Sequence, residues 1–580
     1  MQLSEGVRGV IIAEIFQPLL RVKCPYERKS QVMSSLPIVI GSVVLFILAY
    51  IFYGRWLERK LDINPSRPTP CHTMCDGVDY VPCKPAVLMG HHFASIAGAA
   101  PIVGPITAAA FGWVPVLLWV VIGSIFIGAV HDFSSLAASL RHRGRSIGAI
   151  IEEQVGYSGK LLFMIFCLAA LILVIGAFLV IIAKTFVAEP SVATSSILFI
   201  FLAVLFGQML YRFKMPVLPA TIIGVIGLAI CVWLGLVFPS NIQSESVEQI
   251  WVLVLMAYIL FAAVIPVHLL LQPRDYLNSF LLYAIILAAF IGLVVVHPKI
   301  VLPAFGALNV PGQGFLFPIL FVTVACGAVS GFHSLVASGT TVKQLDNERH
   351  ARVVSYGSML IESLLAVIAL VVVASLAKGR AAEMGGGPAG IFSTGVGEIL
   401  YTFGIPVKTG TTFTALCVSA FALTSLDTVA RVGRFIFQEL FFGKGTIATK
   451  PQGVVAVVLT NRFFAAFVMV ALGGALALSG KWSAIWPLFG SANQMMAAIA
   501  LLAITMWLVR RRISSWFVQI PLYFMFAVTI SALVILCIGN IKAHTYVLAG
   551  IAVFLLAVTV VLIVEAIRSL LRMKYDKVAP

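Results

Sequence analysis

Fifteen long apolar stretches restrict what this chain can fold into more than any other feature of its sequence. A helix needs roughly 20 predominantly apolar residues to cross the hydrocarbon core of a bilayer. Backbone polar groups at that depth must be paired within the chain, so the stretches predict membrane-spanning helices. They lie at 37–53, 87–111, 114–138, 161–187, 196–210, 217–238, 249–271, 279–297, 316–336, 353–377, 411–430, 463–479, 484–509, 516–539 and 546–571.

The composition agrees with this interpretation. Of the 580 residues, 61% are hydrophobic and 11% are charged, whereas about a quarter of the residues in an average soluble domain are charged. This argues against a soluble enzyme, a secreted disulfide scaffold or a nucleic-acid-binding protein. We therefore expect an all-α polytopic membrane protein with about 15 transmembrane helices.

The distribution of basic residues predicts the orientation of these helices. Alternate connections are rich in Lys and Arg, which favours the cytoplasmic side and places the C-terminus there. The loop 239–248, which carries Glu245 and Glu248, falls on the opposite side. The N-terminal 36 residues break the pattern, which means either an unrecognised crossing or a tail that lies in the membrane interface. The basic connections contain Arg55, Arg59, Lys60, Arg141, Arg143, Arg145, Arg212, Lys214, Arg274, Lys343, Arg349, Arg352, Arg431, Arg434, Arg510, Arg511, Arg512, Arg572 and Lys574.

Polar residues inside apolar stretches are costly, and they indicate a transport path, a partner or a break in a helix. The first such segment begins with His91 and His92 and continues through Ser95 and Gly98 to two prolines. Small residues allow close approach of a substrate or a backbone, and proline favours an unwound segment. The segment predicts either a broken helix that lines a substrate site or a packing seam with interfacial histidines.

Two further segments also place polar residues within or at the end of apolar stretches. Gln272, Arg274 and Asp275 surround Pro273, and they predict either a gate or a structural turn with a local ion pair. Residues 330–341 combine glycines and hydroxyls with a histidine. Such groups suit a small cation or a proton carrier, although Ser and Thr also bond to carbonyls of their own helix. The candidates in this segment are His333, Ser334, Ser338, Thr340 and Thr341.

The later apolar stretches also contain polar residues, among them two carboxylates. Glu362 lies deep within 353–377, and a buried carboxylate can take up a proton, so Glu362 is a candidate for proton coupling. Asp427 and Arg431 are four residues apart and are predicted to neutralise each other across one helical turn. Asn493 and Gln494 form another polar pair within 484–509.

A group of cysteines in the basic connector 54–86 raises a different possibility. Cys71, His72, Cys75 and Cys83 fall within 13 residues, and they could ligate zinc or an iron–sulfur cluster. The alternative is a set of reduced, unliganded cysteines, since disulfides are disfavoured in the cytoplasm. No cofactor is required by the rest of the sequence.

The order of the helices is consistent with an inverted repeat. Stretches 87–111 and 249–271 run in opposite directions at matching positions of two five-helix halves, as in inverted-repeat transporters. In this register 316–341 is the eighth core helix. We expect four regions: a tail (1–36), a first helix with its connector (37–86), a transport core (87–431), and a basic loop with accessory helices (432–580).

Several motifs together resemble the carbon starvation protein A family, from about residue 37 to 515. The chain departs from that family in its shorter N-terminus, in His131 where glutamine is expected, and in the cysteines of the connector. The motifs are Asp76–Pro82, Gly90–Phe93 through Gly104 and Pro105, Gln272–Tyr276, Gly331–Ser334 through Thr341, Thr424–Arg431 and Gly490–Gln494.

This resemblance implies a transporter of the bacterial inner membrane, grouped with the amino acid–polyamine–organocation (LeuT-like) superfamily. Its members take up peptides during carbon starvation or, in close relatives, pyruvate with protons. We therefore expect no enzyme activity and predict a substrate site, a coupling site and a gate. A sodium-coupled transporter and a membrane sensor or redox protein that uses the cysteines remain alternatives. The expected substrate residues are His91, His92, Ser95, Gly98, Gln272, Arg274, His333 and Ser334, the coupling residues Glu362, His333, Ser338, Thr340 and Thr341, and the gate or structural residues Asp275, Asp427 and Arg431.

Overall fold

The computed structural model describes residues 33–76, 80–265, 270–376, 380–441 and 454–575. The N-terminal tail expected at 1–36 lies almost wholly outside these residues, as does the middle of the Asp76–Pro82 motif. The described chain is helical apart from loops and one two-stranded hairpin, β1 (Asn309–Val310) and β2 (Gly314–Phe315), in which Asn309 pairs with Phe315.

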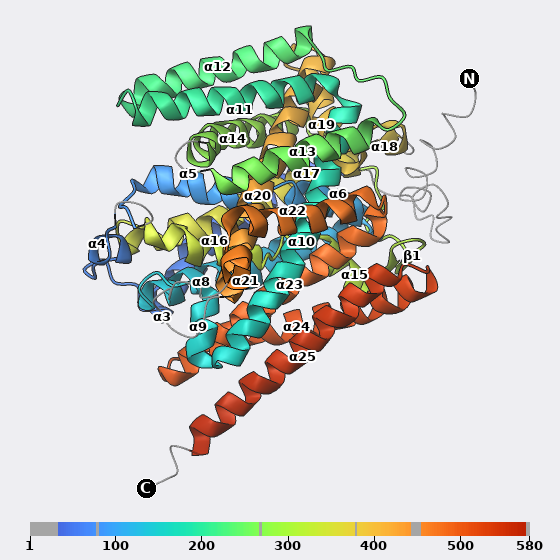
Figure 1. Ribbon diagram of the computed structural model, residues 1–580. Helices are drawn as coiled ribbons and strands as arrows, with labels where there is room; N and C mark the ends of the chain where they lie inside the picture. The colour runs from blue at the N-terminus through green and yellow to red at the C-terminus, as the bar shows by residue number, and fades with distance from the viewer. Residues whose placement is uncertain (1–32, 77–79, 266–269, 377–379, 442–453, 576–580) are drawn as a thin grey trace.

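Within the described residues, twelve helical spans are long and apolar enough to cross a membrane. The expected multi-pass helical membrane protein is thus confirmed (Figure 1). The spans are α2–α3 (Leu36–Lys60), α7–α8 (Trp113–Arg141), α10 (Tyr157–Ala188), α11 (Pro190–Tyr211), α12 (Val217–Val237), α13 (Val247–Val264), α14 (Leu271–Val296), the span Glu348–Ser375 that contains α17 (Ser358–Ser375), α20 (Val407–Leu440), α23 (Trp482–Arg510), α24 (Trp516–Lys542) and α25 (Tyr546–Tyr575).

The other three apolar stretches are also helical, but none is one long helix. Stretch 87–111 forms α5 (Pro85–Ile96) and a second segment, Ala100–Phe111, that contains α6 (Ala100–Ala108) and is bent from α5 by 44°. Stretch 316–336 is divided into α15 (Leu316–Thr323) and α16 (Phe332–Gly339). Stretch 463–479 is α22 (Arg462–Leu478), an apolar helix of 17 residues. The count of about 15 therefore differs because two stretches are interrupted and one is short.

Short helices connect these elements. They are α4 (Pro70–Thr73), α9 (Ile147–Gln154), α18 (Arg380–Glu383), α19 (Gly387–Tyr401) and α21 (Val454–Leu459).

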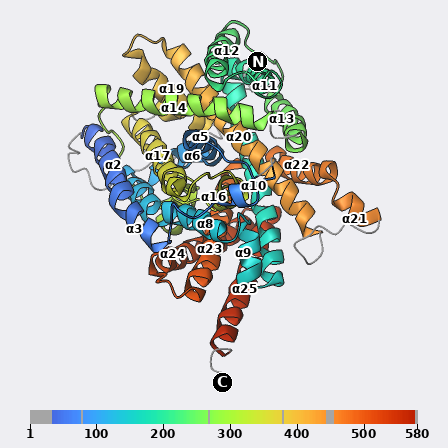
Figure 2. The same cartoon turned by 90° about the vertical axis from the view of Figure 1, so that its left-hand side faces the viewer.

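The two interrupted stretches lie at the centre of the molecule. In Figure 2, α5, α6 and α16 are surrounded by α10, α14, α17 and α20. Spans α10, α17, α20 and α23 are the most buried, whereas α2–α3 and α12 are the least buried, as lipid-facing helices are. Figure 1 shows the α11–α12 hairpin on the outside of the bundle.

The two interrupted stretches are not the pair that the expected repeat placed at matching positions. The stretch matched to 87–111 was 249–271, but its described part, α13, is one continuous helix. The second interruption lies instead between Thr323 and Phe332. The difference arises because α11 and α12 form a peripheral hairpin, whereas the sequence-based count included them in the core.

Close backbone approaches hold the interrupted stretch 316–339 in place. A Cβ atom added at Gly490 of α23 would lie 1.9 Å from the carbonyl oxygen of Val322, and one at Gly128 would lie 2.1 Å from that of Ala328. Both distances are far shorter than a van der Waals contact, so these helices can pack this closely only because the two residues are glycines.

We therefore predict that Gly490→Ala destabilises the protein, because the methyl group would push α23 away from α15. Gly539→Ala is the matched control, since it lies within α24 and its added Cβ would meet nothing within 4 Å. Thermal unfolding in detergent should show a lower midpoint for Gly490→Ala and an unchanged or higher one for the control. Equal midpoints would contradict the packing described here.

Candidate transport site

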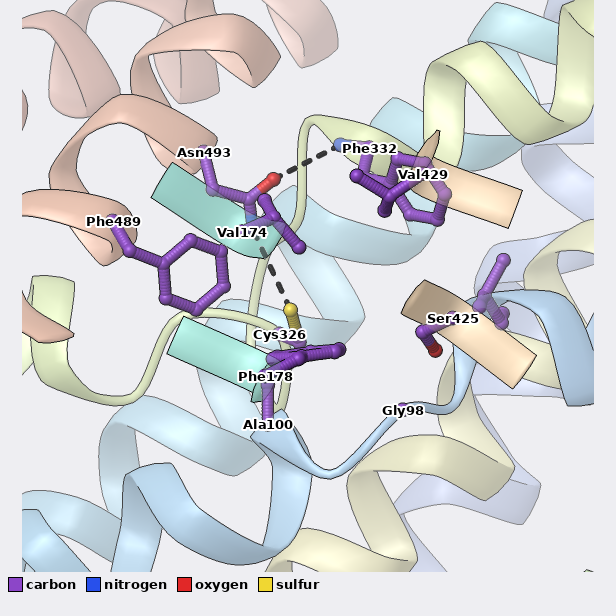
Figure 3. A pocket seen from close by; sticks show the side chains of 11 residues that line it. Gly98, Ala100, Val174, Phe178, Cys326, Phe332, Ser425, Val429, Phe489 and Asn493 are labelled. Carbon is purple, nitrogen blue, oxygen red and sulfur yellow. Dashed lines mark hydrogen bonds between the residues drawn. The ribbon is translucent and has the colours of Figure 1, made fainter. Parts of the chain in front are cut away.

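The α5–α6 break and the α15–α16 break meet at a small cavity, in which about 20 Å³ is open to the centre of a water molecule. Gly98 and Ala100 line it at the first break, and Cys326 and Phe332 line it at the second. Figure 3 shows these residues together with Ser425 of α20 and Asn493 of α23. The other lining side chains are apolar, namely Ile96, Val174, Phe178, Val429 and Phe489.

Asn493 fixes the second break. Its Oδ1 accepts the Phe332 N–H at 3.0 Å, and its Nδ2 donates to Ser330 Oγ at 3.1 Å. Its backbone carbonyl accepts the Gly331 N–H at 3.1 Å. These bonds satisfy backbone donors that an interrupted helix leaves unpaired.

Gly98 and Ser425 face each other across the cavity. A Cβ at Gly98 would lie 2.6 Å from Ser425 Oγ and 3.1 Å from a ring carbon of Phe178. The Ser425 hydroxyl is buried and has no hydrogen-bond partner in the described structure. Gly98, an expected substrate residue, therefore does line the cavity, whereas Ser425 was not singled out in the sequence.

A fully buried ionisable cluster, which we call the coupling cluster, consists of His131, Asp132, His333 and Glu362. Asp132 accepts from His333 Nδ1 at 2.8 Å through one carboxylate oxygen and lies 2.8 Å from His131 Nδ1 through the other. His333 Nε2 lies 3.4 Å from Glu362 Oε2. All four side chains are inaccessible to solvent. The structure thus brings together Glu362 and His333, the two expected proton carriers.

Asp132 was not among the expected site residues, although it carries the same signal as Glu362. It is a carboxylate inside an apolar stretch, 114–138, and that position alone could have identified it. What the sequence could not show is the convergence of α8, α16 and α17 on one point.

A second buried cluster joins α13, α14 and α20. Arg274 is ion-paired with Asp427 and donates to the Tyr258 hydroxyl, which itself donates to Asp427 at 2.8 Å. Asp275 lies 3.7 Å from Arg274 Nη2, as expected for a local pair, and 3.8 Å from His91 Nδ1. We call these five residues the arginine cluster.

The predicted pairing of Asp427 with Arg431 is wrong. Arg274 is the carboxylate's partner, and Arg431 donates instead to the backbone carbonyls of Ala262, at 2.8 Å, and Ile265. The guanidinium of Arg274 is therefore occupied by protein carboxylates and does not line the cavity, although it was expected to meet a substrate. Gln272 lies in the first turn of α14, but its side chain lies outside the described part of the structure.

The hydroxyl candidates of residues 334–341 are satisfied by their own surroundings. Ser334, Ser338 and Thr340 donate to carbonyls three or four residues earlier, at 2.7, 2.6 and 2.9 Å. Thr341 Oγ1 pairs with His92 Nδ1 at 2.8 Å. Ser95 likewise donates to His91 O at 2.8 Å. The contacts of Ser95, Ser334, Ser338 and Thr340 match the helix-bonding alternative, whereas Thr341 pairs with a different helix.

The connector cysteines are held by the loop that follows α16. Cys71 Sγ donates to Leu345 O at 3.2 Å and His72 Nε2 lies 3.0 Å from Asp346 Oδ1, while Cys75 is exposed. Burial raises the pKa values of the Cys71 and Cys83 thiols, which disfavours the thiolate that binds metals. Among the residues that the structure describes, no three His, Cys, Asp or Glu side chains are grouped to hold a metal ion.

The geometry defines the class of protein. It is a multi-pass helical bundle with two interrupted helices around a buried polar centre. A model of the family "Carbon starvation protein CstA" matches residues 34–386 and 381–532. The chain belongs to this family, as the resemblance in its sequence predicted.

Curated relatives support the same assignment. Peptide transporter CstA of Campylobacter jejuni is 32% identical over 565 residues, which cover 86% of this chain and 80% of the relative. Peptide transporter CstA of Escherichia coli is 32% identical, with coverages of 87% and 81%. Pyruvate/proton symporter BtsT of Escherichia coli is 30% identical, with coverages of 87% and 82%. The chain is accordingly a membrane transporter.

Solved structures give weaker similarities. A manganese transporter of Eremococcus coleocola aligns with a TM-score of 0.44 and 13% identity, covering 85% of this chain and 99% of that one. MhsT aligns with a TM-score of 0.46 and 14% identity, covering 84% and 99%.

We predict that the Arg274–Asp427 pair is strongly coupled, because removing one partner leaves an unpaired buried charge at a cost of about 3–5 kcal/mol. Arg274→Met and Asp427→Leu should each lower the thermal midpoint substantially, and the double variant should lose less than the two single losses combined. A double-mutant cycle on unfolding in detergent measures this coupling. Strictly additive losses would show that the two side chains do not depend on each other.

Proposed function

We propose that this protein is a proton-coupled secondary transporter that takes up a small monocarboxylate such as pyruvate across the bacterial inner membrane. The observation that carries the proposal is the coupling cluster, which lies beside the two interrupted helices. The relative named as a pyruvate/proton symporter supports the same substrate and ion. The family's name associates the activity with carbon starvation.

Charge balance supports a proton as the coupling ion. The coupling cluster holds two carboxylates, and a protonated His333 balances the charge of one, Asp132. Glu362 shares this one cation, since His333 Nε2 lies 3.4 Å from its Oε2, and neither of its oxygens has a hydrogen-bond partner in the described structure. Protonation of Glu362 makes the group neutral, which removes a large cost of a charge in a buried site.

The cavity supports a small anion as the substrate. It lies at the N-terminal end of α6, a helix without a side-chain cap, and helix N-termini favour negative charge. Ser425 supplies an unpaired hydroxyl that can donate to a carboxylate. The lining contains no charged side chain that would pair with the amino group of a peptide. Peptides remain the second candidate because two of the relatives above are named peptide transporters.

The order of the helices supports a repeat with a different register. We propose one half made of α5–α6, α7–α8, α10, α13 and α14, and a second made of α15–α16, α17, α20, α22 and α23. The α11–α12 hairpin is then an insertion in the first half. Each half begins with an interrupted helix, and interrupted helices at matching positions are typical of inverted-repeat transporters.

The basic connections support the proposed orientation. Arg141, Lys343 and Arg510 lie at helix ends and loops that we place in the cytoplasm, and the C-terminus after α25 lies on the same side. The arginine cluster then lies toward the cytoplasmic end of α14. We propose that it closes the substrate path on that side.

Uptake into proteoliposomes tests the function. An inwardly directed proton gradient should drive accumulation of labelled pyruvate, because Glu362 must be protonated for the site to be neutral. A sodium gradient of the same size should not. Accumulation of a dipeptide but not of pyruvate would show that the substrate is a peptide. Uptake driven by sodium would show that sodium is the coupling ion.

Glu362→Gln tests the coupling residue. The amide keeps the size of the side chain and imitates the protonated acid, so we expect normal expression, loss of proton-driven accumulation and retained exchange of labelled for unlabelled pyruvate. Glu153→Gln is the control, since Glu153 is half-exposed near the Arg141 end. Undiminished proton-driven uptake by Glu362→Gln would contradict the assignment.

Gly98→Ala and Ser425→Ala test the cavity. The added methyl group at position 98 would occupy the space in front of Ser425, so pyruvate binding should weaken or disappear. Loss of one hydrogen bond to a charged group costs about 1.5–3 kcal/mol, so Ser425→Ala should raise the KM by roughly tenfold or more. Unchanged KM values in both variants would place the substrate elsewhere.

A further inference from the structure

Four buried polar residues lie along the span that contains α17, and we call them the stripe. Glu348 lies in a 3₁₀ turn (Glu348–His350) and Ser355 in a π-helical segment (Arg352–Gly357). Ser358 and Glu362 are four residues apart within α17, so they lie on the same side of that helix. Glu348 is 1% exposed and the other three are fully buried. The stripe therefore leads through the interior from the coupling cluster to the end of the span at which Arg141 lies.

The hydroxyls of this stripe are not used by the protein. In the described structure, Ser355 Oγ and Ser358 Oγ have no hydrogen-bond partner, and neither has Ser135 Oγ of α8. Ser363 of the same helix differs, because it donates to Met359 O at 2.9 Å. An unpaired buried hydroxyl costs about 1–3 kcal/mol, so such groups call for a water or a functional explanation.

Helix α8 contributes the facing side. Gly128, whose added Cβ would meet Ala328 O and Met359, marks the side of this helix that faces the α17 span. Asp132 and Ser135 follow at four and seven residues, so they lie on that same side. The π-helical segment Arg352–Gly357, which includes Ser355, packs against α8 (Ala129–Arg141). Polar groups from both spans therefore line one interior seam.

The other end of the seam reaches the surface. Glu348 accepts from Arg141 at 2.6 and 2.9 Å and from the Asn64 N–H at 2.8 Å. Arg141 also donates to Asp62 O at 2.5 Å, and Asp62 pairs with Arg67 at 2.9 Å. Arg67 also lies 4.0 Å from Glu348 Oε1, and its side chain is 35% exposed, so Glu348 lies next to a group that reaches the surface.

We propose that this seam is a proton route, separate from the substrate cavity, that carries the coupling proton between Glu362 and the surface near Asp62. The inference rests on the proposed function. A proton leaves the Glu362 acid for a hydroxyl or water oxygen, which releases its own proton to the next oxygen, so no bond other than O–H is made or broken. The groups that face Glu362 and Asp132 are His333 from α16, His131 from α8, and, through charge, His92 of α5 and Cys326.

The cavity does not offer such a route. Most of the side chains around it are aliphatic or aromatic and cannot relay a proton. A separate seam lets the proton leave after the substrate has moved.

The test compares net transport with exchange in the variant Ser355→Ala/Ser358→Ala. Net uptake of pyruvate driven by a proton gradient requires release of the proton at every turnover, whereas exchange at equal pH does not. We expect net uptake to fall on the order of tenfold, equivalent to ~1.4 kcal/mol, while exchange stays near that of the unmodified protein. Ser355→Thr/Ser358→Thr, which keeps both hydroxyls, should restore net uptake.

Ser363→Ala is the matched control, since it removes a buried hydroxyl of α17 that the helix already satisfies. Undiminished net uptake in the double alanine variant, or an equal loss of uptake and exchange, would overturn the proton route. If the unmodified protein exchanges pyruvate but shows no proton-driven uptake, the proposed proton coupling fails as well. Transport by the unmodified protein therefore shows whether proton coupling itself fails or only the proton route.

Discussion

The hydrogen bonds of Asn493 are the interaction on which the centre of this structure depends. A helix interrupted within a bilayer leaves backbone donors that no water can satisfy, and such a break persists only where the protein supplies partners. Asn493 provides them for Gly331 and Phe332, and Gly490 of the same helix packs closely against Val322, which lies before the break. The break in turn places His333 beside Asp132 and Glu362, so the coupling cluster exists because α16 begins where it does.

The two buried ionic groups have different consequences. In the arginine cluster, Arg274 is surrounded by two carboxylates and a tyrosine, an arrangement whose partners lie on three helices. This cluster can come apart only if α14 and α20 separate, so it suits a gate that closes the substrate path. The coupling cluster instead contains a carboxylate, Glu362, whose oxygens are unbonded in the described structure. It can change its charge without breaking a strong hydrogen bond, so it suits a proton carrier.

The sequence predicted the parts of the molecule that depend on local chemistry. Every apolar stretch corresponds to a helix or an interrupted pair, and Glu362 and His333 stood out because polar groups are rare in apolar stretches. Asp132 carries the same signal and could have been found. Partners could not be predicted: Arg274 and Asp427 are 153 residues apart, whereas the helical-turn rule considered only Arg431. The register of the repeat stays a prediction, because hydropathy does not distinguish the peripheral α11–α12 hairpin from core helices.

The most direct test of proton coupling by the coupling cluster is the number of protons that move with each substrate. A pyruvate gradient imposed on proteoliposomes, with no initial difference in pH, should carry protons in the same direction as pyruvate. A pH-sensitive dye and labelled pyruvate measured in the same vesicles should give about one proton per molecule, since protonation of one carboxylate neutralises the site. Movement of pyruvate without any change in pH would contradict a coupling role for Glu362 and its neighbours.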